Sequence, residues 1–167
     1  MKKSIILLLV SLFLFINQVN AQTFTNYTTA TTSTTLCNND IFAIAIDANG
    51  NKWFGTRGGV SKFDDNEWTT FTTSDGLTDD IVHSIVIDAE GNKWFGTSVG
   101  VSKFDDTGWT TYATSDSIGY LQCQAIAIDG PGNIWIGTQD AGVVKLYAKK
   151  FSETSEKQKL NQIELIK

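Results

Sequence analysis

The chain has 167 residues, the length of one ordinary domain. Hydrophobic residues make up 41% of it and charged residues 19%, so the chain can bury a core, which argues against wholesale disorder. The net charge of −5 implies no basic surface, which argues against nucleic acid and anionic membranes as partners. Abundant threonine and an aromatic content of 11% favour strands over helices.

Residues 1–21 have the pattern of a secretory signal peptide. Lys2 and Lys3 form a short basic region, an apolar run extends from Ile5 to Ile16, and small residues precede an expected cleavage site after Ala21. The apolar run is too short for a transmembrane helix, which needs about 20 residues. We therefore expect an exported chain, periplasmic or secreted, with no membrane span after cleavage.

The rest of the chain repeats with a period of 41 residues. Gly50, Gly91 and Gly132 are spaced by this period, each within the pattern I-D-x-x-G-N-x-W-x-G-T. Residues 44–72 and 85–113 are identical at 21 of 29 positions. A period of about 40 to 45 residues with short strands is typical of propeller blades. The sequence therefore predicts an all-β fold of three β-propeller-type blades, with residues 22–148 as the repeat region.

Each repeat predicts four antiparallel strands, which in the first copy are residues 42–46, 52–56, 60–63 and 68–72. The first of these is almost wholly apolar, as expected for an inner strand buried on both faces. Gly50 permits the hairpin that follows, and Gly55 indicates a bulge or a close approach of another backbone. We assign structural roles to the residues that recur in every copy: Asp47, Gly50, Asn51, Trp53, Gly55, Asp88, Gly91, Asn92, Trp94, Gly96, Asp129, Gly132, Asn133, Trp135 and Gly137.

The phase of the repeat predicts how the blades end. Residues 24–30 align with a fourth strand, whereas the third copy ends near Tyr147 after only three strands. We therefore expect the N-terminal segment to supply the missing outer strand of the last blade, as closed propellers do to pair their edges. Three blades are fewer than the roughly four to eight of a closed ring, so the ring is incomplete. Residues 149–167 are expected to be a charged tail, disordered or a short helix.

The string D-x-x-G-N-x-W-x-G-T, followed by G-V-S-K-F-D and W-T-T-Y, resembles the two-component regulator propeller repeat over roughly residues 24–147. In that family many blades form the periplasmic sensor region of bacterial histidine kinases, notably those that respond to polysaccharide fragments, and similar repeats occur in secreted proteins. The resemblance implies a bacterial, exported module that binds a ligand in the manner of a sensor and has no catalysis of its own. Residues 149–167 also resemble the linker that precedes a type IX sorting domain in secreted Bacteroidetes proteins, which implies a Bacteroidetes-like source.

Propellers present variable loops on one face, and we place the candidate ligand-binding residues there. These loops differ between the copies while the frame repeats, as expected where loops carry function. The expected ligand is a glycan or another small extracellular molecule. The candidate ligand-binding residues are Arg57, Asp75, Asp79, Asp80, Asp116, Gln139 and Asp140.

Two alternatives stay open. Three blades can associate as a dimer into a six-bladed ring by exchanging the N-terminal strand. The repeat is also similar to that of streptogramin lyase, an enzyme that uses histidine chemistry and a magnesium ion. The only histidine is His83, which aligns with Phe42 and Gln124 in the other copies, and we interpret it as incidental. We expect no catalytic residue, metal or cofactor, and we expect Cys37 and Cys123 to be free thiols.

Overall fold

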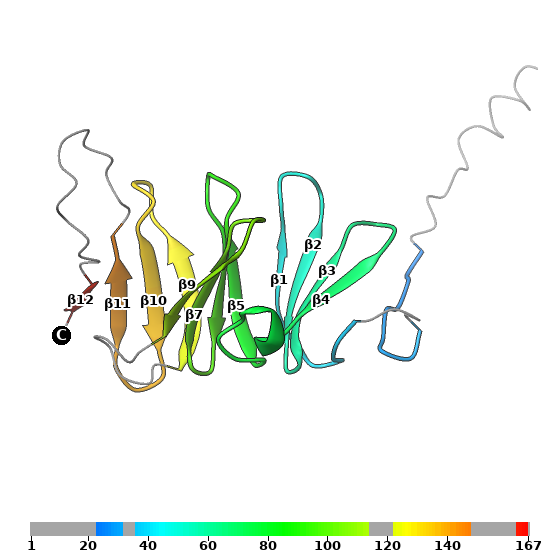
Figure 1. Ribbon diagram of the computed structural model, residues 1–167, viewed down its shortest axis with the longest axis horizontal. Helices are drawn as coiled ribbons and strands as arrows, with labels where there is room; N and C mark the ends of the chain where they lie inside the picture. Colours follow the sequence, from blue (N-terminus) through cyan, green and yellow to red (C-terminus); the bar gives the residue numbers. More distant parts are fainter. Residues whose placement is uncertain (1–22, 32–35, 114–121, 148–162, 167) are drawn as a thin grey trace, which may run out of the picture.

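The computed structural model describes residues 23–31, 36–113, 122–147 and 163–166, so the predicted signal peptide and Asp116 lie outside the described residues. The described residues form three four-stranded antiparallel sheets that lie side by side (Figure 1). Each sheet is one blade, and the predicted all-β, propeller-type fold is confirmed. Cys37 and Cys123 are free thiols.

The strands follow the repeat closely. Blade 1 consists of β1 (Ile41–Ile46), β2 (Lys52–Thr56), β3 (Gly59–Phe63) and β4 (Trp68–Phe71). Blade 2 consists of β5 (Val82–Ile87), β6 (Lys93–Thr97), β7 (Gly100–Phe104) and β8 (Trp109–Ala113). Blade 3 consists of β9 (Cys123–Ile128), β10 (Ile134–Thr138), β11 (Val143–Leu146) and β12 (Ile163–Ile166). The first strand of each blade packs against the first strand of the next. The hairpins after these strands lie along one edge, at the top of Figure 1, which we call the hairpin edge. The connections between blades lie along the opposite edge, the connection edge.

The outer strand of blade 3 comes from the tail, so the prediction that the N-terminal segment fills this place is wrong. β12 pairs with β11, with Leu165 opposite Val144 and Glu164 opposite Lys145. Residues 163–166 are therefore a strand, where a disordered tail or a short helix was expected. Two isoleucines in four residues suit a strand, and pairing satisfies the free edge of β11.

The N-terminal segment lies beside blade 1 instead. The ring of Tyr27 is 5.6 Å from that of Phe63 and 5.8 Å from that of Trp68, measured between centroids. The threonines that follow fold into a turn, in which Thr31 N donates to Thr28 O at 3.0 Å. Phe71 lies on Phe104 and Trp109 in the same way, so Tyr27 takes on blade 1 the place of a fourth-strand aromatic without belonging to a paired strand.

An aspartate holds the inner hairpin of each blade to the tryptophan of the next strand. In blade 2, Asp88 accepts hydrogen bonds from Asn92 N at 2.8 Å, Asn92 Nδ2 at 2.7 Å and Trp94 Nε1 at 2.9 Å. The equivalent residues of blades 1 and 3 make the same three bonds. Gly91 has a φ of 86°, which only glycine adopts without strain and which the turn requires. One carboxylate therefore fixes both a turn and an indole ring.

The fixed tryptophans form the core between blades. Trp53 is 1% exposed and packs with Phe95 of blade 2, and Trp94 packs in the same way with residues of blade 3. Gly55 lies where blades 1 and 2 approach closely, because a Cβ at this position would be 2.9 Å from Val82 Cγ1. Cys123 occupies the equivalent place in blade 3, and burial raises the pKa of its thiol to about 11.

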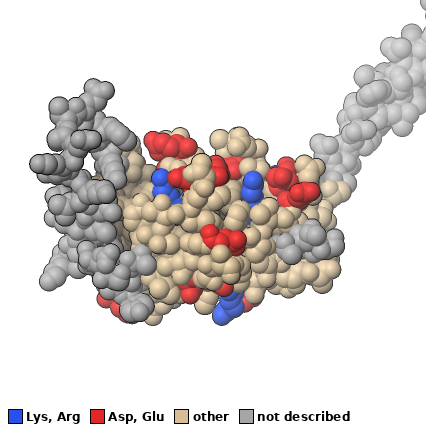
Figure 2. All heavy atoms as spheres, viewed as in Figure 1, with Lys and Arg blue, Asp and Glu red and all other residues tan. Residues whose placement is uncertain are grey.

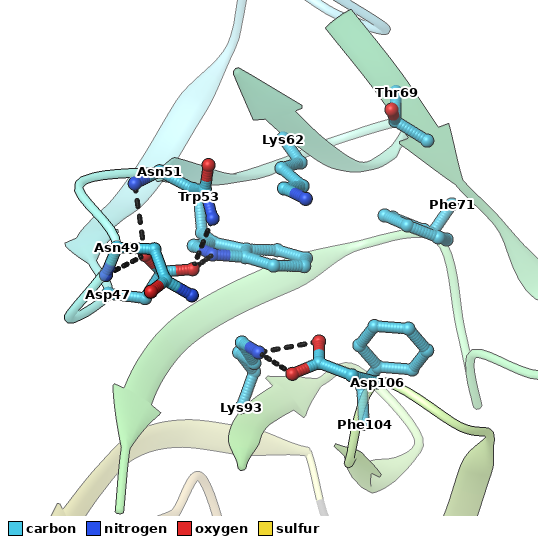
Figure 3. Close-up of a pocket in the computed structure, with 10 residues that line it drawn as sticks. All are labelled: Asp47, Asn49, Asn51, Trp53, Lys62, Thr69, Phe71, Lys93, Phe104 and Asp106. Carbon is cyan, nitrogen blue, oxygen red and sulfur yellow. Dashed lines mark hydrogen bonds and ion pairs between the residues drawn. The ribbon is translucent and has the colours of Figure 1, made fainter. Parts of the chain in front are cut away.

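A buried lysine joins blades 1 and 2 near the hairpin edge. Lys93 is 3% exposed, and its Nζ lies 2.6 and 2.7 Å from the carboxylate oxygens of Asp106. The same Nζ is 5.2 Å from the ring centroid of Trp53, and Lys62 Nζ is 5.6 Å from that ring (Figure 3). The indole thus has two ammonium groups near it, which interact favourably with its electron-rich faces.

Acidification is expected to destabilise the chain through the hairpin aspartates. Burial alone would raise the pKa of Asp88, but hydrogen bonds from Trp94 and Asn92 outweigh it, and the pKa lies below its ordinary value of 3.8. A carboxylate whose pKa is lowered in the folded state stabilises that state above its unfolded pKa, and this stabilisation is lost as the pH falls through the folded value. The thermal unfolding midpoint, followed by circular dichroism, should change little between about pH 7 and 5 and fall below about pH 4.

The substitution Asp88→Asn tests the same device at neutral pH. It removes the charge from three hydrogen bonds, and we expect a free energy of unfolding that is lower by about 1–2 kcal/mol. Asp140→Asn, in an exposed loop of the connection edge, is the matched control and should be nearly neutral. Chemical denaturation measures both variants, and equal stability of the two would contradict the role of Asp88.

The seam between blades 1 and 2 gives a second matched pair of variants. Asp106→Asn leaves the ammonium group of Lys93 buried without its counter-ion, and we expect a loss of about 1–3 kcal/mol in unfolding free energy. Asp65→Asn breaks the equivalent pair with Lys52, whose side chain is 29% exposed, and should cost about 0.5 kcal/mol or less. Both aspartates have positive φ, which asparagine tolerates, so the backbone cost is matched. Equal losses would show that burial of the lysine is irrelevant.

Candidate functional site

The inner strand of every blade has a bulge near the connection edge. In β1 the pairing register with β2 shifts between Ile41 and Ala43, and β5 and β9 shift at the equivalent position. The residue skipped by the pairing is Phe42 in blade 1, His83 in blade 2 and Gln124 in blade 3. A bulge re-aims the side chain that it carries and is common beside functional sites. At this one position of the repeat, three different side chains therefore lie outside the regular strand pairing.

These side chains and their neighbours form a continuous group, which we call the inner rim. The rings of Phe42 and His83 are 5.5 Å apart. His83 Nε2 lies 2.9 Å from Ser98 Oγ and 3.5 Å from Gln122 Nε2, and Gln122 precedes β9 of blade 3. Since the contacts run from blade 1 to blade 3, the inner rim spans all three blades.

The two ends of the inner rim are also polar. The guanidinium carbon of Arg57 is 5.7 Å from the ring centroid of Phe42, and Arg57 Nε donates to Asp40 Oδ2 at 2.8 Å. At the other end, Gln124 Nε2 lies 3.5 Å from Gln139 Oε1. The rim thus combines an exposed phenyl ring, an imidazole, several carboxamides and one ion pair that neutralises its own charge.

The structure brings together some of the predicted ligand-binding residues but not all. Arg57 and Gln139 belong to the inner rim, and Asp140 is exposed beside Gln139. The remaining described acids bond the backbone of the connection between blades 1 and 2. Asp75 accepts from Thr72 N at 2.8 Å, Asp79 from Ile81 N at 2.9 Å and Asp80 from Thr73 N at 2.7 Å. These three carboxylates shape the loop, and a role in ligand binding stays a prediction for the whole set.

Sequence reasoning missed the bulged residues as a group. His83 was interpreted as incidental, and Phe42 and Gln124 entered only as its register partners. The aligned repeats contain a signal for this group, because one position changes from phenylalanine to histidine to glutamine inside an otherwise apolar strand. That a bulge turns this position out of the sheet required the structure.

A hollow of about 380 Å³ lies near the hairpin edge, between blades 1 and 2 (Figure 3). Its aromatic wall consists of Trp53, Phe71 and Phe104, and its charged groups include Lys93 and Asp106, which bond each other. Acidic side chains gather along this edge, as Figure 2 shows. Most of the lining belongs to the frame that holds the blades together, so we assign the hollow to the seam and not to a ligand.

Two further observations concern the described part of the chain. No group of three or more histidine, cysteine, aspartate or glutamate side chains there is arranged to hold a metal ion. None of the helical segments in that part is long and apolar enough to cross a membrane.

Comparison with known proteins adds a family match over one segment, and the fold. Residues 35–58 match the family model "Two component regulator propeller". No curated protein matches the chain significantly. The matched segment runs from the connection before β1 to the loop after β2, so it contains the inner hairpin and its aspartate–tryptophan bond.

Solved structures share the fold. The extracellular domain of a hybrid two component system from B. thetaiotaomicron is 24% identical, with a TM-score of 0.66 over 75% of this chain and 18% of that one. A second such domain from B. thetaiotaomicron is 19% identical, with a TM-score of 0.56 over 65% and 15%. A streptogramin B lyase is 22% identical, with a TM-score of 0.53 over 65% and 37%. The chain thus spans less than half of each of these proteins, and at such identities the likeness shows the fold alone. The resemblance predicted from the sequence is confirmed to this extent: residues 35–58 match the two component regulator propeller model, and the described chain has a propeller-type fold.

Proposed function

We propose that the chain is an exported, sensor-like binding module that takes a small extracellular ligand at the inner rim and performs no catalysis of its own. The observation that carries the proposal is the bulge, which recurs in all three blades while its side chain changes from Phe42 to His83 to Gln124. A frame that repeats around one variable, outward-turned position is the arrangement expected of a binding surface on a rigid scaffold.

The chemistry of the inner rim suits a polar ligand without charge. Its carboxamides, imidazole and hydroxyl group donate and accept hydrogen bonds, and the charge of Arg57 is compensated by Asp40. Phe42 is 41% exposed and offers an apolar face. An oligosaccharide combines hydroxyl groups with apolar ring faces, so we propose this class of ligand.

Two observations support export. Residues 1–21 have the pattern of a signal peptide, and the similar domains of the B. thetaiotaomicron regulators are extracellular. The likeness to streptogramin B lyase concerns the fold, and the geometry favours binding over catalysis. Among the described residues, the polar contacts of the His83 ring are to Ser98 and Gln122, and neither supplies the carboxylate that commonly orients a catalytic imidazole.

Isothermal titration calorimetry with defined oligosaccharides tests the proposal. The probes are cellohexaose, xylohexaose, maltohexaose and a heparin hexasaccharide, of which the first three are neutral and the last is anionic. We expect a neutral probe to bind, and we expect His83→Ala and Gln124→Ala each to weaken binding about tenfold, the effect of one lost hydrogen bond. Glu90→Ala, in an exposed hairpin loop on the opposite edge, should bind like the unmodified chain. Unchanged binding in both rim variants would place the site elsewhere, and binding of the anionic probe alone would contradict the ligand class.

A further inference from the structure

The first blade exposes most of a face that is buried in the other two, and Tyr27 covers only its outer part at Phe63 and Trp68. Ile85 of blade 2 and Ile126 of blade 3 pack against the preceding blade and are 9% and 8% exposed. The equivalent Ile44 of blade 1 is 62% exposed, and Ile46 is 64% exposed. We call this surface, which also includes Ile41, Lys52 and Phe54, the leading face.

In the described part of the chain, no blade packs on the opposite half of the same interface, which belongs to the third blade. Val60 of blade 1 and Val101 of blade 2 pack against the following blade and are 0% and 3% exposed. The equivalent Val143 of blade 3 is 42% exposed. We call this surface, which consists of Ala125, Ala127, Trp135, Gly137 and Val143, the trailing face. The two faces lie at opposite ends of the row of blades (Figure 1).

A glycine on the trailing face has space that its equivalents lack. A Cβ at Gly55 would meet Val82 Cγ1 at 2.9 Å, and a Cβ at Gly96 would meet the Cys123 sulfur closer still. At Gly137 the nearest atom would be 3.7 Å away, in Ala125 of the neighbouring strand, which is an ordinary contact. At Gly55 and Gly96 the lack of a side chain lets the next blade pack closely. Gly137 leaves the same space, and no blade of the described chain fills it. The residue equivalent to Val82 that would enter is Ile41 of a leading face.

A lysine of the leading face and an indole of the trailing face are also complementary. In the internal seam, Lys93 lies over Trp53 while it is paired with Asp106. The equivalent Lys52 is paired with Asp65 on the leading face, and no blade of the described chain lies beneath it. On the trailing face Trp135 is the indole in the place of Trp53. Docking of the two faces would put Lys52 over Trp135.

We propose that the leading face of one copy packs on the trailing face of a second copy, and that the reverse contact closes a six-bladed ring of two chains. Each contact would continue the seam between blades 1 and 2, with equivalent apolar residues, a glycine and a lysine; in the seam between blades 2 and 3, Ile134 takes the place of the lysine. Six blades fall within the roughly four to eight of closed propellers, and a head-to-tail contact that closes is a ring and not a filament. Since β12 already completes blade 3, no strand needs to be exchanged. Tyr27 lies on Phe63 and Trp68 as Phe71 lies on Phe104 and Trp109 in the internal seam, so the N-terminal segment must move aside for the contact to form. The proposal stands independently of ligand binding at the inner rim.

Light scattering on the purified chain and on one variant tests the proposal. The unmodified chain should have twice the mass of one chain at micromolar concentration. Gly137→Val should fold, because a Cβ has room there within one copy, and a β-branched residue suits a strand. In the dimer the same side chain would collide with Ile41 of the second copy at both contacts, so we expect the dissociation constant to rise by about 100-fold or more. Thr110→Val, on the outer strand β8 of blade 2, is the matched control and should remain dimeric.

Mixing two variants tests the head-to-tail arrangement. Ile44→Glu alters the leading face and should also abolish the homodimer. A mixture of Ile44→Glu and Gly137→Val retains one intact contact, and it should form a weak heterodimer that neither variant forms alone. A monomeric unmodified chain at about 100 μM, a series of larger oligomers, or a dimer that Gly137→Val leaves intact would each overturn the proposal. Circular dichroism melting of every variant separates loss of association from loss of folding.

Discussion

The hydrogen bond from a tryptophan indole to a turn aspartate is the interaction on which the rest of the structure depends. Asp88 accepts the Nε1 proton of Trp94 and two bonds from Asn92, so one carboxylate fixes the hairpin and the plane of the indole together. A tryptophan held in one orientation gives the blade a defined surface for the next blade. The same bond in all three blades makes the seams alike, and repetition of the seam produces a regular row.

A regular row has two unlike ends, and this follows from the direction of packing. Each blade contributes isoleucines from its first strand to one seam and a tryptophan, a valine and a glycine to the other. The end blades therefore expose complementary halves, and Ile44 and Val143 are exposed for the same reason. The equivalent lysines differ in burial for the same reason, because Lys93 is buried over Trp53 whereas Lys52 reaches solvent.

Much of this architecture is readable from the sequence, because a repeat displays each local rule three times. Gly55 was predicted to mark a bulge or a close approach, and it does both, since it pairs opposite the bulge and faces Val82. The origin of the outer strand of blade 3 was not readable. β11 belongs to the third repeat, but its partner, residues 163–166, lies outside the repeat. A short charged tail with isoleucines at a spacing that also suits a helix contains no local signal for this pairing.

The candidate site was only partly readable for a related reason. Sequence patterns report which residue types occupy the loops, and they correctly place Arg57 and Gln139 on the connection edge. They do not report that Asp80 accepts a hydrogen bond from a backbone amide, or that His83 lies in a bulge with its ring next to Ser98. Side-chain direction at a bulge depends on the pairing register, which is a property of two strands and not of one.

In the proposed two-chain ring, symmetry links the number of ligands bound at the inner rim to the contact between the end faces. One chain presents Phe42, His83 and Gln124 in a row, and a ring of two chains would present the row twice, with Gln124 of one copy next to Phe42 of the other. A ligand that fits one row would bind twice per ring, whereas a ligand that reaches across the axis would contact both rows and bind once. The stoichiometry of binding therefore carries information about assembly that affinity does not. In the second case, loss of the dimer through Gly137→Val would weaken binding although the variant lies on the trailing face and not in the rim, which would couple the two surfaces through association alone.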